Sequence, residues 1–347
     1  MGLSERERFT RCAFGQDIDM LPVQCDFSGR GLKHFLNGKG ISRVSDLELL
    51  PFFENHVLYA YMNGAVLKMK TKDFHGEAYV YDEWGCKWDT SQDLFYCNHP
   101  IENWEDYEKY EFPDPYAPGY LDYAEGLVKE YGKRYIVTSY HFCCLFERAY
   151  ILRGFENVLM DFYEEEELLT QLLDRITDFH VELAKRYISI GVNCGRTVDD
   201  YGSQTGMIMS PDMWRRFIKP RLAKIHAVYR NAGLPIIHHS CGNITQIIED
   251  LIEIGVSVLN PVQPNVMDLQ QLARDYGDRL SFFGGICNQK VLPFLSPQEI
   301  QENVRQVRNI LGAHGRYIIS PSNGIGPDVP MENVEAYFQA AKKYRRL

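Results

Sequence analysis

Residues 235–242 read Pro-Ile-Ile-His-His-Ser-Cys-Gly, a short apolar run that ends in polar side chains and a glycine. Asn243 follows as a candidate N-cap, and residues 244–254 have the spacing of apolar residues that is typical of a helix. The stretch therefore predicts a buried strand that leads directly into a helix. Strand–helix units of this kind build parallel sheets whose two faces are both covered.

The same alternation runs from about residue 133 to the end of the sequence. Short apolar strands are expected at 135–140, 193–199, 235–241, 256–260, 280–286 and 317–320. Helices are expected at 143–153, 164–190, 211–232, 244–254, 268–276, 296–311 and 331–345. No glycine-rich phosphate motif follows any of these strands, so a closed (β/α)8 TIM barrel is favoured over an open dinucleotide-binding sheet.

The N-terminal part of the chain departs from this alternation. A helix is expected at 4–15, a short strand at 21–26 and a mostly helical segment at 45–70. Aromatic and polar residues alternate over 76–100, which predicts a small antiparallel β insertion. We therefore expect an α/β protein with one TIM-barrel domain over 1–347, an N-terminal extension and this β insertion.

Composition excludes several classes of partner. The formal net charge of -10 argues against nucleic acid or an anionic membrane as the main partner. Charged residues interrupt every apolar run, so no transmembrane segment is expected. The N-terminus has no apolar signal region, and the nine scattered cysteines suit reduced thiols, which together predict a cytoplasmic protein.

Polar side chains follow the predicted strands at their carboxyl ends, where barrel enzymes place their active sites. The candidate substrate-binding residues there are Asp26, Arg30, Tyr140, Gln204, Asn260, Gln263 and Asn323. Loops are polar in most proteins, so position alone does not separate a site from a surface. The recurrence of these groups at one end of the predicted sheet favours a small-molecule site.

His239 and Cys241 are two positions apart, so on an extended chain they point to the same side. Imidazole nitrogen and thiolate sulfur are ligands that zinc prefers. Cys287 ends another predicted strand and could supply a third ligand, leaving one open position for a substrate. The alternative is a buried cysteine that packs as a small apolar side chain beside a hydrogen-bonded histidine.

Asp199 and Asp200 end the strand predicted at 193–199. Neighbouring residues on a strand point to opposite faces, so one carboxylate should face the inside of the barrel. The inward carboxylate could serve as a general acid or base, or orient a metal-bound histidine, and the other could cap a turn. With His238, these two residues are the candidate catalytic groups.

Segments over nearly the whole chain resemble the uroporphyrinogen decarboxylase (URO-D) superfamily, which also contains corrinoid-dependent methyltransferases. The matching segments are 6–23, 82–85, 146–157, 199–204, 210–220, 239–242, 260–263 and 321–333. The resemblance implies a single (β/α)8 barrel and makes a homodimer a reasonable expectation.

The branch of the superfamily is indicated by two motifs. Decarboxylases carry a Met-Arg-Gln-Ala-Gly-Arg motif whose arginines meet the acidic arms of the tetrapyrrole, and residues 25–33 match only its last arginine, at Arg30. The methyltransferases bind zinc through His-x-Cys and a distant Cys in a Pro-Gly-Cys-Gly-like loop. This chain has His239 and Cys241, but Asn323 stands where the distant Cys would be. The resemblance then leaves the third ligand to Cys287, Asp199 or a water.

The resemblance implies a methyltransferase that moves a methyl group between a small donor and cobalamin, with zinc as the metal. The missing distant Cys argues against a thiol acceptor and favours relatives that demethylate aryl methyl ethers, with a methoxylated aromatic as donor. No Asp-x-His-x-x-Gly carrier motif is present, so the corrinoid would be supplied by a partner protein.

Two alternatives stay open. One is a decarboxylase of the kind that acts in porphyrin biosynthesis, and the other is a non-catalytic tetrapyrrole-binding protein. A decarboxylase of a polyanionic substrate needs several basic groups at the barrel mouth. The candidates for them are Arg30, Lys33, Arg196 and Lys290.

Overall fold

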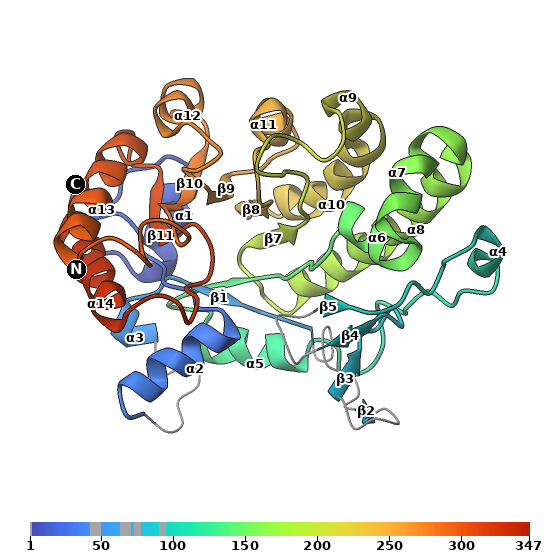
Figure 1. The fold of residues 1–347 in the computed structure, drawn as a ribbon, viewed down its shortest axis with the longest axis horizontal. Helices are drawn as coiled ribbons and strands as arrows, with labels where there is room; N and C mark the ends of the chain where they lie inside the picture. Colours follow the sequence, from blue (N-terminus) through green and yellow to red (C-terminus); the bar gives the residue numbers. More distant parts are fainter. Residues whose placement is uncertain (1, 42–49, 63–70, 73–77, 90–94) are drawn as a thin grey trace.

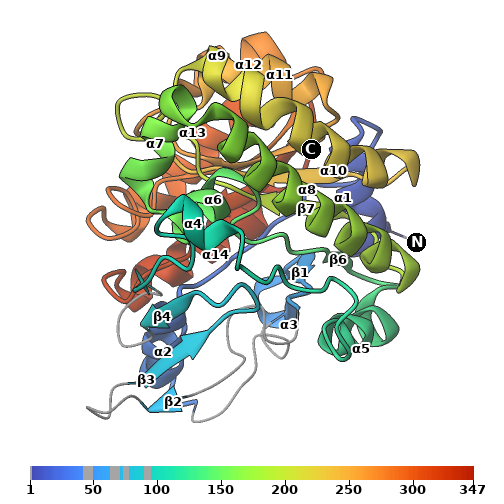
Figure 2. The same ribbon diagram turned by 90° about the vertical axis from the view of Figure 1, so that its right-hand side faces the viewer.

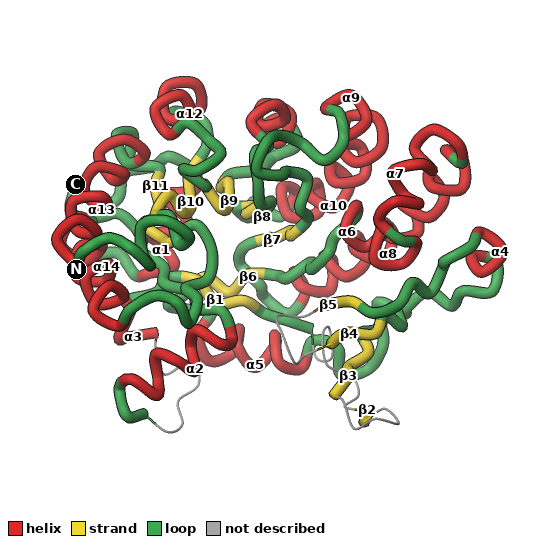
Figure 3. The backbone as a smooth tube through the Cα atoms, viewed as in Figure 1, coloured by secondary structure: helices red, strands yellow, loops and turns green. Residues whose placement is uncertain are grey.

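The computed structural model describes residues 2–41, 50–62, 71–72, 78–89 and 95–347. Figure 3 shows most of the strands in the middle of the molecule with helices around them, and a few short strands at its lower right edge. Five parallel strands lie side by side in chain order and form most of the wall of a barrel. They are β7 (Gly195–Val198), β8 (Ile236–His239), β9 (Val258–Val262), β10 (Ser281–Ile286) and β11 (Tyr317–Pro321).

Two further parallel strands extend the wall beyond β7. β1 (Val57–Tyr59) pairs in parallel with β6 (Ile136–Thr138). Bridges between Thr138 and Cys194, and between His141 and Thr197, connect this pair to β7. At the other edge, a parallel bridge joins Val23 to Ile319 of β11. The segment 21–24 is thus the last member of the wall.

Side chains close the seam between residues 21–24 and β1. Gln24 Oε1 accepts hydrogen bonds from the backbone N–H groups of His56 and Val57, and its Nε2 donates to the Val57 carbonyl. His56 Nδ1 lies 3.0 Å from the Val23 carbonyl oxygen. Within the described part of the chain, the wall therefore consists of eight parallel segments, the number expected of the predicted (β/α)8 barrel.

Helices surround these strands, as Figures 1 and 2 show. They are α1 (Glu5–Ala13), α2 (Gly29–Gly38), α3 (Leu50–Phe53), α4 (Trp104–Tyr107), α5 (Asp122–Tyr131), α6 (Phe146–Arg153), α7 (Phe155–Glu164), α8 (Glu166–Ser189), α9 (Pro211–Met213), α10 (Lys219–Asn231), α11 (Ile248–Glu253), α12 (Leu269–Tyr276), α13 (Pro297–Leu311) and α14 (Met331–Tyr344). A π-helical turn (Trp214–Ile218) precedes α10, and a 3-10 turn (Thr245–Ile247) precedes α11. Among these residues, no helix is both long enough and apolar enough to cross a membrane.

Alternation along β7 decides which of its side chains reach the barrel interior. A Cβ at Gly195 would lie 2.6 Å from the Tyr229 ring of α10, so this position faces outward against the helix. Thr197 Oγ1 lies 3.0 Å from Nε2 of His226, also on α10. Because successive residues of a strand face opposite sides, Arg196 faces inward.

The predicted antiparallel insertion is present but begins earlier than residue 76. Its strands are β2 (Thr71–Lys72), β3 (Ala78–Tyr81), β4 (Lys87–Asp89) and β5 (Phe95–Tyr96). Residues 76, 77 and 90–94 of the predicted insertion lie outside the described residues. A buried ion pair of 2.7 Å, between Asp82 and Arg148 of α6, ties the sheet to the barrel.

The prediction of a mostly helical segment at 45–70 is wrong at β1, which is a barrel strand. Three apolar residues are too few to show the period of a strand, and the pairing with β6 comes from residues about 80 positions away. Residues 42–49 and 63–70 lie outside the described part of the chain.

Candidate active site

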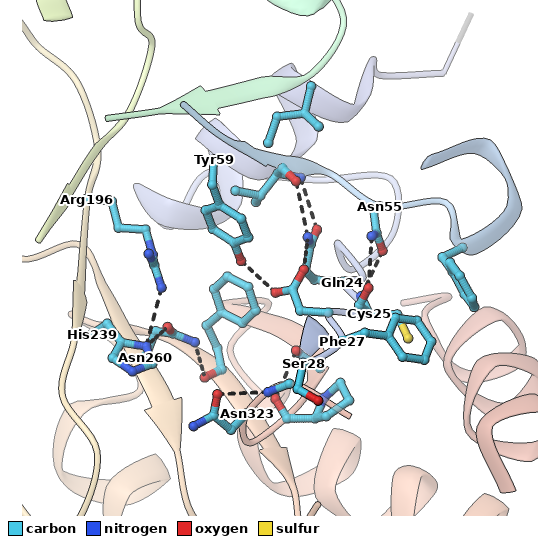
Figure 4. A pocket seen from close by; sticks show the side chains of 18 of the residues that line it. Gln24, Cys25, Phe27, Ser28, Asn55, Tyr59, Arg196, His239, Asn260 and Asn323 are labelled. Atoms are coloured by element: carbon cyan, nitrogen blue, oxygen red, sulfur yellow. Dashed lines mark hydrogen bonds between the residues drawn. The ribbon is translucent and has the colours of Figure 1, made fainter. Parts of the chain in front are cut away.

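A pocket of about 510 Å³ lies at the carboxyl ends of the barrel strands. Much of its lining is aromatic: Phe27, Phe53, Tyr59, Tyr61, Tyr123, Tyr140 and Phe283. Figure 4 shows polar side chains converging on the pocket, with Gln24 and Tyr59 on one side and Arg196, His239 and Asn260 on the other. The pocket can therefore hold a flat organic molecule against a small set of polar groups.

Three potential metal ligands meet beside this pocket, and one of them, His239, lines it. Ligand atoms of Asp200, His239 and Cys241 all lie within 4.8 Å of one another. His239 Nε2 and Cys241 Sγ are 3.6 Å apart, which confirms that the two side chains point the same way. Nitrogen, sulfur and carboxylate oxygen form a donor set that suits zinc.

A hydrogen bond from His239 to Asn260 fixes the imidazole. Nδ1 of His239 lies 2.7 Å from Oδ1 of Asn260, and this oxygen can only accept, so Nδ1 carries the proton. Asn260 Nδ2 donates in turn to the Phe283 carbonyl at 3.4 Å, which fixes the amide. Nε2 of His239 is left with its lone pair toward Cys241, the arrangement that metal-binding histidines use.

The backbone around Cys241 is held by side chains of neighbouring strands. Asp200 Oδ1 accepts from the N–H of Cys241 at 2.8 Å, and Gln263 Oε1 accepts from the N–H of Gly242 at 2.7 Å. Gly242 has φ +80, and a Cβ there would lie 2.2 Å from the backbone of Gly202. Only glycine therefore fits this tight approach of two loops.

Burial sets the charge states of His239 and Cys241. Burial lowers the pKa of His239 and raises the pKa of Cys241 well above its ordinary value. In the free protein at neutral pH, the imidazole is neutral and the thiol holds its proton. A thiolate-binding metal would displace that proton, so metal affinity at this site rises with pH.

Asn323 completes this side of the pocket. Its Nδ2 lies 3.6 Å from the sulfur of Cys241. The loop at 321–324 thus reaches the cluster, as the resemblance implied, with an amide where relatives have a thiol. Among the described residues, the third ligand atom nearest to His239 and Cys241 is a carboxylate oxygen of Asp200.

Asp199 faces away from the pocket. Its carboxylate accepts hydrogen bonds from the backbone N–H groups of Leu145, Phe146 and Glu147 at 3.1, 2.9 and 2.8 Å, the first turn of α6. Burial raises its pKa to about 6, against these hydrogen bonds. The structure thus gives Asp199 a helix-capping position, and it is Asp200 that faces inward.

His238 and Cys287 are also placed apart from the cluster. His238 is fully buried on the outer face of β8, where its Nδ1 lies 2.9 Å from the hydroxyl of Thr197. Cys287 Sγ accepts from Asn265 Nδ2 at 3.0 Å and borders a small separate hollow. The alternation that points His239 inward necessarily points His238 outward.

The remaining candidates divide into two groups. Asp26, Tyr140, Asn260 and Asn323 line the pocket. Arg30 is exposed on α2 and outside the pocket lining, and Gln204 and Gln263 border the small hollow beside Cys287.

The sequence-based reasoning missed two residues of the site. Tyr59 donates a 2.6 Å hydrogen bond to Asp26, and the sequence did not indicate it because the pattern predicts a helix over 45–70, where β1 lies. Glu147 is buried beside Asp200, and its pKa is raised well above the ordinary value, first by burial and then by the charges of Asp200 and Asp199. A carboxylate at the start of the Phe146–Arg153 helix, directly after an apolar run, was the available signal.

Comparison of the sequence with known proteins shows to which family the chain belongs. The profile described as uroporphyrinogen decarboxylase (URO-D) matches residues 82–344. The methylcobamide:CoM methyltransferase MtaA of Methanosarcina barkeri is 27% identical over 182 residues, covering 52% of this chain and 50% of the relative. MtbA of Methanosarcina acetivorans is 23% identical over 265 residues, 74% of each chain.

Other relatives carry different names. A uroporphyrinogen decarboxylase of Thermus thermophilus is 26% identical over 183 residues, covering 52% of this chain and 50% of the relative. The chain thus spans about half the length of the first curated relatives that it matches. A solved structure, a methyltransferase from Methanosarcina mazei, covers 99% of both chains with a TM-score of 0.73 and 17% identity, which supports the fold. With the profile covering most of its length, the chain belongs to the uroporphyrinogen decarboxylase family.

Proposed function

We propose that the protein is a corrinoid-dependent methyltransferase whose metal site is formed by Asp200, His239 and Cys241. The observation that carries the proposal is the meeting of these three ligands beside an aromatic pocket that His239 lines, with His239 oriented by Asn260. Similarity to methylcobamide methyltransferases supports this branch of the family.

Zinc is the metal that the donor set fits, and when bound it would act as a Lewis acid on the heteroatom that carries the methyl group. The residues of this chain do the rest. Asn260 holds the imidazole in the required tautomer, and Gln263 and Asp200 hold the loop that carries Cys241. The aromatic walls align a flat donor and exclude water from its reacting end.

The aromatic lining favours a methoxylated aromatic compound as the donor. The mixed composition of the ligand set, with one sulfur instead of two, supports the same choice. A single thiolate leaves the metal a harder and stronger Lewis acid, which suits an ether oxygen better than a thiol. The methyl acceptor in this proposal is a cobalamin that a separate corrinoid protein presents at the barrel mouth.

Charge in the pocket disfavours a polyanionic tetrapyrrole as the substrate. Of the four basic candidates, Arg196 lines the described pocket, whereas Arg30, Lys33 and Lys290 are exposed outside its lining. The eight carboxylates of a uroporphyrinogen would meet one guanidinium in the described part of this pocket, too few to balance their charge.

We also propose that the whole chain acts as one barrel domain, in the cytoplasm and as a homodimer. All nine cysteines are free thiols, as expected of a protein in a reducing compartment. Gel filtration with light scattering measures the oligomeric state directly.

The test is methyl transfer to cob(I)alamin. Purified protein is supplied with zinc, cob(I)alamin and a set of methoxylated aromatic donors, and methylcobalamin is followed by its absorption spectrum. We expect methylcobalamin with the unaltered protein and a loss of at least 100-fold in rate with Cys241→Ala. Equal rates for the two proteins, or no product with any donor while coproporphyrinogen forms from uroporphyrinogen, would contradict the proposal.

A further inference from the structure

Arg196 is a buried cation whose guanidinium has no acidic partner. Its side chain enters the barrel from the middle of β7 and lines the pocket, with the residue 7% exposed. Nε and Nη1 are buried without a hydrogen-bond partner among the described residues. Nη2 lies 3.4 Å from Nδ1 of His239, but that nitrogen carries the proton donated to Asn260 and offers no lone pair.

Aromatic rings occupy the faces of this guanidinium. Its carbon lies 4.6 Å from the centroid of the Tyr59 ring and 4.8 Å from that of Tyr140. These contacts favour a cation at this place, but they leave Nε–H and Nη1–H, which lie in the guanidinium plane, without acceptors among the described residues. A new partner must therefore approach in that plane, from within the pocket.

The acidic residue on the opposite wall is already engaged. Asp26 accepts a 2.6 Å hydrogen bond from the Tyr59 hydroxyl and a 2.8 Å bond from Gln24 Nε2. Among the described residues, Arg196 makes no ion pair, unlike the buried Arg148, which pairs with Asp82 at 2.7 Å. Burying a charge is unfavourable unless it is paired, so the arrangement points to an anion that the protein itself does not supply.

We propose that Arg196 binds a carboxylate of the methyl donor, so that the substrate is a methoxylated aromatic monocarboxylate. This inference rests on the proposed function and adds the charge and the orientation of the donor. One unpaired guanidinium takes one carboxylate, and the rings of Tyr59 and Tyr140 flank the position that the attached aromatic group would occupy.

The placement of Arg196 gives the direction in which the donor lies. Arg196 belongs to the body of β7, whereas Asp200 and Cys241 follow the carboxyl ends of β7 and β8. The acidic end of the donor therefore points into the barrel and the methoxy group points toward the cluster and the mouth. A corrinoid protein, which is too large to enter the barrel, can reach a methyl group only in this orientation.

Isothermal titration calorimetry on the purified full chain tests the proposal with a matched pair of probes. 4-Methoxybenzoate carries the carboxylate, and 4-methoxybenzamide has nearly the same shape without the charge. We expect the unaltered protein to bind the acid at least 10-fold more tightly than the amide. Arg196→Met should remove this preference, and Arg196→Lys should keep part of it. Lys33→Met, which removes an exposed cation of α2, should keep all of it.

Thermal unfolding of the Arg196 variants and their affinity for the amide show whether the pocket is intact. Equal affinity for acid and amide in the unaltered protein, or an acid preference that survives in Arg196→Met, would overturn the proposal. The carboxylate site at Arg196 and the proposed methyltransferase function can be refuted independently of each other. Methyl transfer from the amide at the rate of the acid would refute the carboxylate site and leave the methyltransferase standing. A carboxylate preference that depends on Arg196, with no methyl transfer from any donor, would refute the proposed function alone.

Discussion

Asp199 and Asp200 are consecutive residues whose carboxylates serve opposite sides of the barrel wall. Asp199 accepts three backbone N–H groups at the start of α6. Asp200 accepts the N–H of Cys241 and lies within ligand distance of Cys241 and His239. The alternation of side chains along a strand, continued for two residues past the end of β7, separates a structural carboxylate from a candidate ligand.

Replacing Asp199 and Asp200 one at a time distinguishes the structural carboxylate from the candidate metal ligand. Asp199→Ala leaves three N–H groups of α6 without their acceptor, so we expect a loss of about 2 to 3 kcal/mol in the free energy of unfolding with zinc binding retained. Asp200→Ala should change stability less and lower zinc affinity at least 10-fold. Urea unfolding and chelator competition measure the two quantities, and the reverse assignment would contradict the account.

Asn260 should control zinc affinity without touching the metal. Asn260→Ala removes the acceptor that fixes the His239 tautomer, and we expect zinc affinity to fall about 10- to 100-fold. Asn265→Ala is the matched control, because Asn265 donates to Cys287 instead. An unchanged affinity in Asn260→Ala would show that the imidazole needs no orienting partner.

Adding a second sulfur should strengthen the site. Asn323→Cys places a thiol next to Cys241, since the Asn323 amide lies 3.6 Å from its sulfur. We expect zinc affinity to rise at least 10-fold, because thiolate is a better zinc ligand than amide. Ser322→Cys is the control, since the Ser322 hydroxyl is turned to the Ile286 carbonyl. A rise in both variants would indicate adventitious binding.

His56 should make stability depend on pH. Burial, aided by the charges of Arg345 and Arg8, lowers its pKa from 6.5 to about 3. Below pH 6.5 the unfolded chain binds a proton here that the folded chain does not, so this contribution is present above pH 6.5 and falls as the pH drops toward 3, by about 1.4 kcal/mol per pH unit.

The buried acids Glu83 and Asp199, whose pKa values are raised to about 8 and about 6, act in the opposite direction, so the informative quantity is a difference between variants. Between pH 7.5 and 5.5, His56→Gln should lose about 1.4 kcal/mol less of its free energy of unfolding than the unaltered protein. Urea unfolding at both pH values measures this difference. An equal loss in both proteins would show that His56 takes up its proton in the folded state.

Local sequence pattern was sufficient for most of the barrel. Apolar runs followed by amphipathic helices predicted β6 to β11, and the two-residue spacing of His239 and Cys241 predicted their meeting. β1 was missed because three residues show no period, and the seam at Gln24 is closed by a side chain, which no backbone pattern reveals.

The choice of Asp200 as the candidate third ligand could not be predicted from the sequence pattern alone. Alternation predicted that one of Asp199 and Asp200 faces inward, but the register that selects Asp200 is set by pairing with β8. Cys287 ends a strand of the same barrel, and only the packing of its loop turns its sulfur toward Asn265. Packing between residues far apart in the sequence therefore decides which carboxylate faces inward and where the sulfur of Cys287 points.

The central claim is a metal site made by His239 and Cys241 with Asp200. The most direct measurement is metal content by mass spectrometry of the purified protein beside Cys241→Ala and Cys287→Ala. The account predicts near-stoichiometric zinc in the unaltered protein and in Cys287→Ala, and its loss in Cys241→Ala. Zinc that persists in Cys241→Ala, or that disappears in Cys287→Ala while Cys241→Ala retains it, would contradict the account.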